Sequence, residues 1–373
     1  MKILQTPARF YPYRGGVENY VYYLSKELVK LGNSVKVICA NQPFSKKEDK
    51  IDGIKVYRLS YIAKIANTNI TLSLPIALFK ENFDILHTHL PHPWSADWSA
   101  FFSVLKKKPL VLTYHDDIVG NNLNYYVAKS YNLSFLKVLL RSAKKIIVTQ
   151  KKYIERSLYL KNYLKKILVI PPGVDLEEFK PLQEKKNDEK IILFLGILDE
   201  FHSYKGLDFL IKAFVVVKEK ILNTRLLIGG EGILKKHYQK LVSSLKLEDR
   251  VNFLGFIPQE KLISYYNSCD VFVLPSVSEI QEGFGLVLLE ALACAKPVVA
   301  TDVVGVAKDI REFKAGIIVK PQGVKELAEA IIQILSDEKL AKQMGKSGLE
   351  LVRKNYNWTD IARKILELYH SVV

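Results

Sequence analysis

Cysteine is scarce in this sequence, and its few copies form no pattern. The 373 residues include three, Cys39, Cys269 and Cys294, without a Cys-x-x-Cys pair or a histidine at metal-ligand spacing. These counts argue against a disulfide framework and against a structural zinc site. A reducing, intracellular compartment is therefore expected.

Long apolar runs are missing as well. The apolar segments 213–217 and 286–289 are far shorter than the roughly 18 residues that a membrane span needs. The first residues, MKILQTPARFYPYRGG, hold too few consecutive apolar residues for a signal-peptide core. We expect no transmembrane helix, no secretion and a cytoplasmic location, either free or peripheral on the inner face of a membrane.

Apolar and aromatic residues, by contrast, are abundant. Hydrophobic residues make up 49% of the chain, with 20 Tyr and 17 Phe. This is enough apolar surface to build stable cores, so a largely disordered chain is excluded. The length exceeds one ordinary core and suits two domains of typical size.

The formal net charge of +16 lies almost entirely in the first half. Residues 1–180 contain 28 Lys and Arg against 14 Asp and Glu, whereas residues 181–373 contain 27 against 25. A lopsided basic surface attracts polyanions such as phosphate-bearing lipid, nucleic acid or an acidic sugar. A lysine-rich surface kept for solubility explains the charge equally well.

Short apolar or β-branched segments alternate with helical patterns along the first half. One helical pattern runs from Glu18 to Leu31 and ends at Gly32, and another runs from Ser95 to Leu105. This alternation predicts a parallel α/β sheet. The expected strands are residues 2–5, 35–40, 54–59, 84–88, 109–114 and 145–149.

The same alternation restarts after a proline-containing break at residues 171–190, which speaks against one continuous eight-fold barrel. We expect two doubly wound, Rossmann-like parallel-sheet domains at residues 1–175 and 191–356. Residues 176–190 would connect them, and residues 357–373 would form a C-terminal helix. The expected strands of the second domain are residues 191–196, 225–230, 251–255, 271–275, 297–301 and 315–319.

The segment from Glu282 to Glu290, EGFGLVLLE, is the most informative for function. A helix that begins near Phe284 points free backbone N–H groups at the end of the preceding strand, and two glycines let a phosphate approach. Glu290 is the only charged residue in the run LVLLEALACA, so its carboxylate needs a partner such as sugar hydroxyls. A glutamate at the core edge, bonded to neighbouring backbone or to a lysine, is the alternative.

Two carboxylates at this spacing in an EGFG-type segment resemble the retaining glycosyltransferases of the GT-B fold, in glycosyltransferase family four (glycosyl transferases group one). Other matches follow in the family's order over nearly the whole chain. Gly15-Gly16-Val17-Glu18 resembles the glycine-rich acceptor-side loop and Lys205-Gly206 the donor lysine. The remaining matches are DILHTH at 84–89, TYHD at 113–116, PGVD at 172–175 and a final helix from Trp358 like the one that crosses back to the first domain.

The resemblance implies transfer of a sugar from a nucleoside-diphosphate sugar to an acceptor hydroxyl with retention, in a cleft between the two domains. It implies that Lys205 and the amides around Phe284, Gly285 and Leu286 stabilise the leaving diphosphate. Glu282 would contact the transferred sugar and Glu290 the ribose hydroxyls. The other implied donor-binding residues are Gly16, Phe256, Ile257 and Gly283. No metal and no cofactor beyond the donor substrate is expected, and no Asp-x-Asp triad is present.

One departure from the family concerns the donor phosphates. Most members carry an arginine shortly after the strand that opens the second domain, and the stretch FLGILDEFHSYKG at 194–206 has none. His202, three residues before Lys205, is the candidate replacement, and an ordinary surface histidine is the alternative.

His115 resembles the family's active-site histidine, which holds sugar hydroxyls or helps to move a proton. The resemblance places Gly15, Gly16, Glu18, His89, His115 and Asp116 on the acceptor side. His87 and His89 alternate on a strand and so point the same way. Without a third ligand nearby, a structural or cleft-lining role is favoured over a metal pair.

The lysines of the first half are interleaved with aromatic and aliphatic residues, a mixture that suits the headgroup layer of an anionic membrane. This favours a lipid-linked acceptor, such as a polyprenyl-phosphate or diphosphate glycan, in glycan or glycolipid biosynthesis. A soluble acceptor, as in sucrose-phosphate or glycogen synthases, is an equal alternative.

Two other classes fit less well. No nucleic-acid partner is expected, because the usual recognition signatures are absent and the second half is nearly neutral. A nicotinamide dehydrogenase is disfavoured because Lys235 stands where a GxGxxG motif needs its last glycine.

Overall fold

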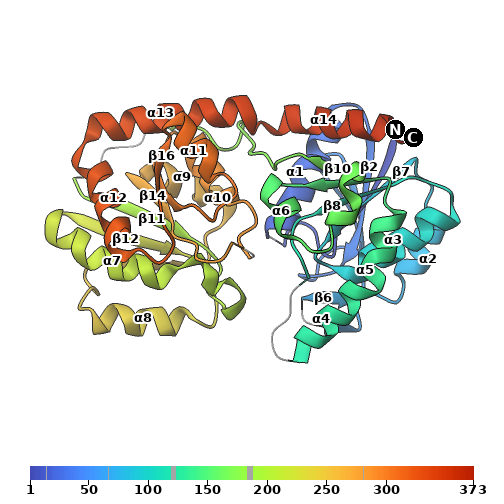
Figure 1. Ribbon diagram of the computed structural model, residues 1–373, viewed down its shortest axis with the longest axis horizontal. Helices are drawn as coiled ribbons and strands as arrows, with labels where there is room; N and C mark the ends of the chain where they lie inside the picture. The colour runs from blue at the N-terminus through green and yellow to red at the C-terminus, as the bar shows by residue number, and fades with distance from the viewer. Residues whose placement is uncertain (14, 66, 119–122, 183–187, 280) are drawn as a thin grey trace. The chain divides into compact units, whose positions relative to one another are not determined.

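The computed structural model describes residues 1–13, 15–65, 67–118, 123–182, 188–279 and 281–373 (Figure 1). The chain divides into two compact units. Unit 1 comprises Met1–Pro172 and Trp358–Val373, and unit 2 comprises Gly173–Asn357. Residues 176–190, expected as a connector, group with unit 2, as do residues 173–175, and part of the connector, 183–187, lies outside the described residues.

Unit 1 is built on an eight-stranded sheet of order β10-β9-β8-β7-β1-β2-β4-β3. All neighbouring pairs are parallel except β3 and β4. The central strands are buried on both faces, which explains their continuous apolar runs. The strands are β1 (Lys2–Thr6), β2 (Ser34–Ala40), β3 (Glu48–Ile51), β4 (Ile54–Leu59), β7 (Ile85–Leu90), β8 (Leu110–Tyr114), β9 (Lys145–Val148) and β10 (Ile167–Val169).

Three short strands of unit 1 carry no clear sequence signal. Two of them, β5 (Ala63–Ile65) and β6 (Thr68–Ile70), form a separate antiparallel pair, and β3 is the antiparallel edge of the main sheet. β3 reads EDKI and β5 is exposed throughout, so neither shows the apolar pattern of a buried strand.

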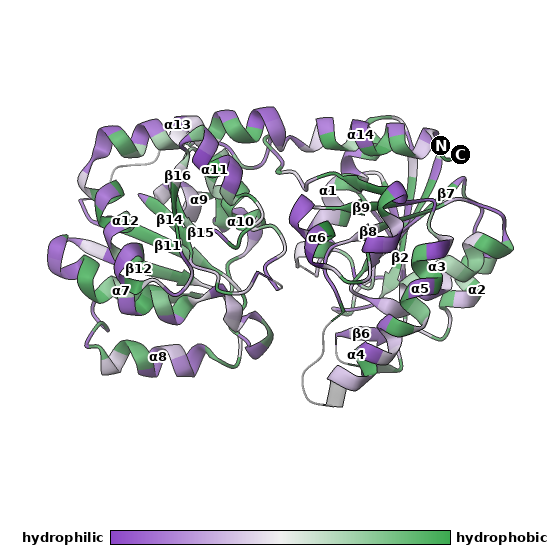
Figure 2. Ribbon diagram, viewed as in Figure 1, coloured by the Kyte–Doolittle hydropathy of each residue, from purple (hydrophilic) through white to green (hydrophobic). Residues whose placement is uncertain are grey.

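Helices α1 and α14 of unit 1 each bury one apolar face. In α1 the buried residues Tyr20, Val21, Leu24 and Leu28 follow the helical period, and α1 packs against α14. α14 buries Trp358, Ile361, Ile365 and Tyr369, and hydrophobic and hydrophilic residues alternate along it in Figure 2. The helices are α1 (Gly16–Lys30), α2 (Leu74–Lys80), α3 (Pro93–Leu105), α4 (Leu123–Leu133), α5 (Phe135–Ser142), α6 (Lys151–Arg156), the 3-10 helix η1 (Lys161–Lys166) and α14 (Trp358–His370).

Unit 2 contains a six-stranded sheet of order β13-β12-β11-β14-β15-β16 in which every neighbouring pair is parallel. Its strands match the expected ones to within one residue at each end. They are β11 (Lys190–Leu195), β12 (Thr224–Gly229), β13 (Val251–Gly255), β14 (Val271–Leu274), β15 (Val298–Thr301) and β16 (Gly316–Val319).

Helices cover the sheet of unit 2. α7 packs against α12, and α10 packs against α9 and α13. The helices are the 3-10 helix η2 (Glu200–Lys205), α7 (Leu207–Lys220), α8 (Lys235–Ser244), α9 (Gln259–Ser268), α10 (Leu286–Ala293), α11 (Ala307–Phe313), α12 (Val324–Ser336) and α13 (Glu338–Asn355). No helix in the described part of the chain has the length and hydropathy to cross a membrane.

Candidate active site

The strand order of unit 2 reverses at β11. This strand lies between β12 on one side and β14 on the other, so the connections after β11 and β14 leave the sheet at neighbouring C-terminal ends. Ligands of open α/β sheets bind at this kind of switch point. The segments that follow β11 and β14 contain Lys205 and Glu282.

Glu282 is a buried carboxylate with two partners. Its side chain is 3% exposed, and its Oε2 accepts a hydrogen bond from Ser276 Oγ at 2.6 Å. Lys205 Nζ lies 3.6 Å from the same oxygen. Thr301 Oγ1 donates to the carbonyl of Ser276 at 2.6 Å, which ties this loop to the end of β15. A buried carboxylate beside a single cation and a single hydroxyl retains acceptor capacity for a ligand.

The backbone around Lys205 explains how this lysine reaches Glu282. Gly206 has φ 73, and a Cβ there would lie 2.1 Å from the carbonyl oxygen of Pro275. Val277 N donates to the carbonyl of Tyr204 at 2.7 Å. Gly196 gives room on the other side, since a Cβ there would lie 2.9 Å from Lys205 Cδ. Two glycines thus let η2 pack closely against the loop after β14.

The N-terminus of α10 opens next to this loop. Gly285 precedes the helix with φ 85, and among the described residues no side chain caps the helix. The helix begins at Leu286 rather than near Phe284, because the left-handed Gly285 interrupts the helical backbone. Phe284 is buried and its ring contacts that of Tyr356 at 5.5 Å. The first amides of α10 remain suited to an anion.

Glu290, one helical turn further along α10, is half-buried. Its Oε2 accepts a hydrogen bond from Tyr266 Oη at 2.6 Å. Burial and the charge of Glu290 raise the pKa of Tyr266 well above its usual value, so the phenol stays a donor. The carboxylate is therefore already oriented by a neighbouring side chain, the phenol of Tyr266.

His202 forms a close pair with Asp199. Oδ1 of Asp199 accepts from the backbone N of His202 at 2.9 Å and lies 2.6 Å from its Nδ1. Asp199 is the N-cap of η2, so one carboxylate starts the helix and orients the imidazole. Because a carboxylate oxygen only accepts, Nδ1 of His202 carries a proton; Nε2 accepts when the imidazole is neutral and donates when both ring nitrogens are protonated.

The ends of β12 and β13 form the neighbouring part of unit 2. Phe256 is 71% exposed, while Ile257 is half-buried and close enough to Gly229 that a Cβ there would meet its Cδ1 at 2.5 Å. Gly230 has φ 134, and a Cβ on it would overlap the carbonyl of Gly196. The GGEG segment at 229–232 is therefore explained by close backbone packing.

In unit 1, the loop before α1 holds a buried ion pair. Arg9 Nε lies 3.0 Å from Oε1 of Glu18, and both side chains are at most 5% exposed. Gly15 is required there, because a Cβ would lie 2.4 Å from Oε2 of Glu18, whereas a Cβ on Gly16 would meet nothing within 4 Å. Glu18, expected on the acceptor side, is thus committed to Arg9.

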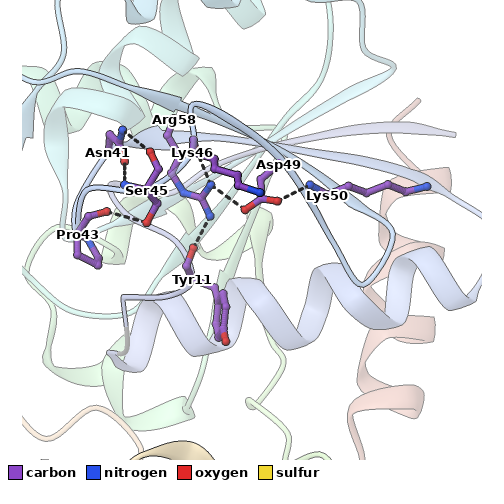
Figure 3. Close-up of polar contacts among 8 residues, drawn as sticks. All are labelled: Tyr11, Asn41, Pro43, Ser45, Lys46, Asp49, Lys50 and Arg58. Carbon is purple, nitrogen blue, oxygen red and sulfur yellow. Dashed lines mark hydrogen bonds and ion pairs between the residues drawn. The ribbon is translucent and has the colours of Figure 1, made fainter.

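Arg58 on β4 anchors the same loop (Figure 3). Its guanidinium donates to the carbonyl of Tyr11 at 2.7 Å, to that of Lys46 at 2.9 Å and to Asp49 Oδ2 at 3.2 Å. The backbone N of Ser45 donates a hydrogen bond to Oδ1 of Asn41 at 2.8 Å, which closes the adjacent turn. Arg58 therefore fixes the backbone at Tyr11 to β4, the strand next to the edge of the sheet.

His115 lies just beyond the end of β8 and is 9% exposed. Its Nε2 lies 3.4 Å from Nδ1 of His89. His89 itself is fully buried, which agrees with the structural one of the two roles favoured for it, and its Nε2 lies 2.9 Å from Oε1 of Gln5. Burial lowers the pKa of His115 to about 3 and lowers that of His89 well below its usual value.

Asp116, the next residue, is half-buried and accepts a hydrogen bond from Tyr153 Oη at 2.6 Å. Asp117 accepts from Tyr114 Oη and from Ser157 Oγ, the latter at 2.8 Å. In the described residues, no three His, Cys, Asp or Glu side chains converge in a way that could hold a metal ion.

Several supporting residues escape sequence reasoning. Ser276, Tyr266 and Asp199 orient the proposed donor residues of unit 2, and Arg9 and Arg58 hold the loop of unit 1. Of these residues, Asp199 has a sequence signal, because aspartate is one of the residues that commonly precede the first turn of a helix. The others become visible only when distant segments come together.

Comparison with known proteins agrees with this architecture. The model of glycosyltransferase family 4 matches residues 14–178, and that of glycosyl transferases group 1 matches residues 175–351. The chain belongs to this family-four group of glycosyltransferases, which have the GT-B fold.

Relatives and solved structures extend over the whole chain. An uncharacterized glycosyltransferase of Methanocaldococcus jannaschii is 28% identical, covering 96% of this chain and 95% of the relative. The GPI3 subunit of phosphatidylinositol N-acetylglucosaminyltransferase of Saccharomyces cerevisiae is 26% identical, covering 97% and 81%. The structure of sucrose-phosphate synthase from Thermosynechococcus elongatus superposes with a TM-score of 0.80 at 26% identity, covering 99% and 98%.

Proposed function

We propose that this glycosyltransferase moves a sugar from a nucleoside-diphosphate sugar to an acceptor hydroxyl with retention of configuration. The observation that carries the donor assignment is the pairing of Lys205 with the buried Glu282 beside the N-terminus of α10. A cation, a row of amides and a carboxylate that accepts sugar hydroxyls are what a departing diphosphate and its sugar require.

Each donor group has a proposed role. Lys205 and the amides of Phe284, Gly285 and Leu286 bind the diphosphate, and His202 adds a donor in the place of the family's usual arginine. Glu282 binds the transferred sugar, with Gly283 beside it. Glu290, oriented by Tyr266, binds the ribose hydroxyls. Phe256 and Ile257 bind the base, which the exposed ring of Phe256 supports.

Unit 1 is proposed to supply His115, which bonds a sugar hydroxyl, and the acceptor surface along Gly15, Gly16 and Asp116. The space beside Gly16 supports a close approach of substrate to the backbone. The proposed reaction needs no metal and no cofactor. The leaving diphosphate accepts the acceptor's proton as the new glycosidic bond forms on the face from which it departs.

A lipid-linked acceptor is supported by the surface of unit 1. The packed helices α2, α3, α4 and α5 expose apolar side chains next to basic ones, the composition of proteins that rest on anionic membranes. The GPI3 relative acts, by its name, on phosphatidylinositol. The exposed apolar residues are Ile76, Phe79, Phe101, Val104, Leu105, Phe135 and Val138, and the exposed basic ones are Lys80, Lys107, Lys137, Arg141 and Lys144.

A water-soluble acceptor is the second candidate. It is favoured by the likeness to sucrose-phosphate synthase, whose name describes a soluble product. Under that reading the lysines of unit 1 serve solubility or attract a phosphorylated sugar.

The first experiment identifies the donor. Thermal unfolding of the purified protein is followed with UDP, GDP and ADP and their common sugar conjugates, for the wild type and for Glu290→Ala. Stabilisation by one nucleotide that the substitution abolishes supports the donor site, because a ligand that binds only the folded state stabilises it. The absence of stabilisation by any of them overturns the assignment.

The second experiment separates the acceptors. Transfer from the identified donor is measured to polyprenyl-phosphate glycans in anionic vesicles and to soluble sugar phosphates. NMR of the product tests retention, and added EDTA tests metal independence. Transfer only to the soluble acceptors overturns the lipid proposal and leaves the donor site in place.

A further inference from the structure

Six polar side chains form one buried chain of contacts inside unit 1. They come from β1, β7, β8 with the residue that follows it, and α14, and none is more than 9% exposed. Its members are Gln5, His87, His89, Thr113, His115 and Tyr369.

The contacts run in sequence from His115 to Thr113. His115 Nε2 to His89 Nδ1 is 3.4 Å, and His89 Nε2 to Gln5 Oε1 is 2.9 Å. Gln5 Nε2 to Tyr369 Oη is 3.5 Å. His87 Nδ1 to Tyr369 Oη is 2.5 Å, and His87 Nε2 to Thr113 Oγ1 is 2.7 Å.

All three imidazoles are neutral in the folded protein at ordinary pH. Burial lowers the pKa of His87 and of His115 to about 3, and it lowers that of His89 well below its usual value. A neutral imidazole has one nitrogen that donates and one that accepts. The choice of donor in one contact therefore decides which atom can donate in the next contact.

Gln5 determines the direction of the first branch. Its Oε1 can only accept, so Nε2 of His89 carries the proton and Nδ1 of His89 accepts. His115 must then donate from Nε2, which leaves its Nδ1 unprotonated. Among the described residues, Nδ1 of His115 has no hydrogen-bond partner, so it is available to accept from a hydroxyl.

The second branch runs from Gln5 through Tyr369 and His87 to Thr113, and each of its donors points away from Gln5. Gln5 Nε2 donates to Tyr369 Oη, so this hydroxyl donates onward to Nδ1 of His87. Nε2 of His87 then donates to Thr113 Oγ1. Rotating the amide of Gln5 by half a turn would reverse every donor in both branches. The chain is thus a single unit with two states, as expected of a coupled buried network.

We propose that Gln5 and Tyr369 are positioning residues that fix which ring nitrogen of His115 carries the proton. With Oε1 of Gln5 facing His89 and Nε2 of Gln5 facing Tyr369, the network holds the proton on Nε2 of His115 and presents Nδ1 to the substrate as an acceptor. This inference rests on the proposed function in assigning His115 to the reacting sugar. It gives the last helix, α14, a part in the site through Tyr369, 364 residues away from Gln5 in sequence.

The direct test is imidazole nitrogen NMR on protein labelled with ¹⁵N-histidine, which distinguishes the two tautomers. The signal of His115 is assigned from its loss in His115→Asn. Wild-type protein is expected to hold His115 as the Nε2–H tautomer. Tyr369→Phe and Gln5→Met each remove a link while keeping most of the side chain's volume, and both are expected to give a mixture of tautomers.

Two further variants make the result specific. Gln5→Glu keeps an oxygen that accepts from His89, so it is expected to retain the wild-type tautomer of His115. Tyr131→Phe removes a hydroxyl that donates to Asp97 at 2.7 Å in the same unit, outside the network, and it is expected to leave the tautomer unchanged. If Tyr369→Phe fails to fold, Thr113→Val removes the far end of the chain instead.

Kinetics complete the test. In Tyr369→Phe and Gln5→Met, kcat is expected to fall in proportion to the lost Nε2–H population, about two- to tenfold, with a smaller change in KM. An unchanged tautomer in these folded variants overturns the proposal, and so does a redistributed tautomer with unchanged kcat. Full transfer by His115→Asn would overturn the role of His115 in the proposed function. The NMR result would still decide whether the network sets the tautomer.

Discussion

Gly15 and Glu18 are so close that the two positions determine each other. A Cβ on Gly15 would lie 2.4 Å from Oε2 of Glu18, a carboxylate held in a buried ion pair with Arg9. The adjacent Gly16 has open space instead. Packing therefore explains the glycine at position 15, and a binding role is proposed only for Gly16.

Gly15→Ala is expected to destabilise unit 1 by about 1–3 kcal/mol, because the added methyl group displaces a buried carboxylate from its partner. Gly16→Ala is expected to leave the free energy of unfolding nearly unchanged and to raise KM, because the methyl group occupies space proposed for substrate. Denaturant unfolding and steady-state kinetics of both variants decide this. Wild-type kinetics in Gly16→Ala would remove Gly16 from the site.

Lys205→Met is expected to lower kcat/KM by about 10²–10³, the usual effect of removing one group that stabilises a leaving oxyanion. It also leaves Glu282 without its cation, 3.6 Å away in the wild type. Lys308→Met is the matched control, since the Lys308 side chain is 81% exposed and, among the residues that the structure describes, pairs only with Glu312, at 3.6 Å. An equal effect in both variants would contradict a specific role for Lys205.

Asp199 and His202 are expected to act as one group. Asp199→Asn keeps an oxygen for the backbone N of His202 but removes the carboxylate charge 2.6 Å from Nδ1. We expect the nucleoside-diphosphate Kd to rise about three- to tenfold in Asp199→Asn and in His202→Ala, with little further rise in the double variant. Calorimetric titration measures all three. Additive effects would show that His202 binds donor without help from Asp199.

The stability of unit 1 is expected to fall as the pH is lowered from 7 to 5. Four buried histidines have lowered pKa values in the folded protein, to about 3 for His87, His92 and His115 and well below 6.5 for His89. The unfolded chain therefore binds more protons below about pH 6.5, and each histidine costs about 2 kcal/mol between pH 7 and 5.

Asp97 has the opposite effect on the free energy of unfolding, because burial raises its pKa to about 6 and the folded protein therefore binds its proton more readily. It is one group, however, against four histidines. Denaturant unfolding at pH 7, 6 and 5 measures the slope. His92→Gln is expected to reduce it by about one proton, and His370→Gln, at an exposed position, is expected to leave it unchanged. A flat profile in the wild type would contradict the prediction.

Much of the fold was predictable from sequence because parallel strands buried on both faces read as short apolar runs. In unit 2, β11, β14 and β15 follow this rule. The missed strands are those that the rule does not cover, such as β3 at a half-exposed edge and the exposed β5. The start of α10 was expected two residues early because the φ of Gly285 cannot be read from its identity.

The candidate site was predictable where a local motif carries it, as for Glu282, Lys205 and His115. It was not predictable where the partner lies far away in sequence. Ser276 and Tyr266 look like ordinary residues until they meet Glu282 and Glu290. His89 and Glu18 stand at matching motif positions, and only packing reveals that both are buried and bonded to other side chains; their acceptor-side roles stay predictions.

The division of the chain has a consequence for its synthesis. Unit 2 is continuous, but unit 1 lacks α14 until the residues of unit 2 have been made. A nascent chain therefore exposes the face of α1 that Trp358 later covers, and it leaves His87 without the hydroxyl of Tyr369. The core of unit 1 is therefore finished when α14 emerges from the ribosome, and not when the first sheet is complete.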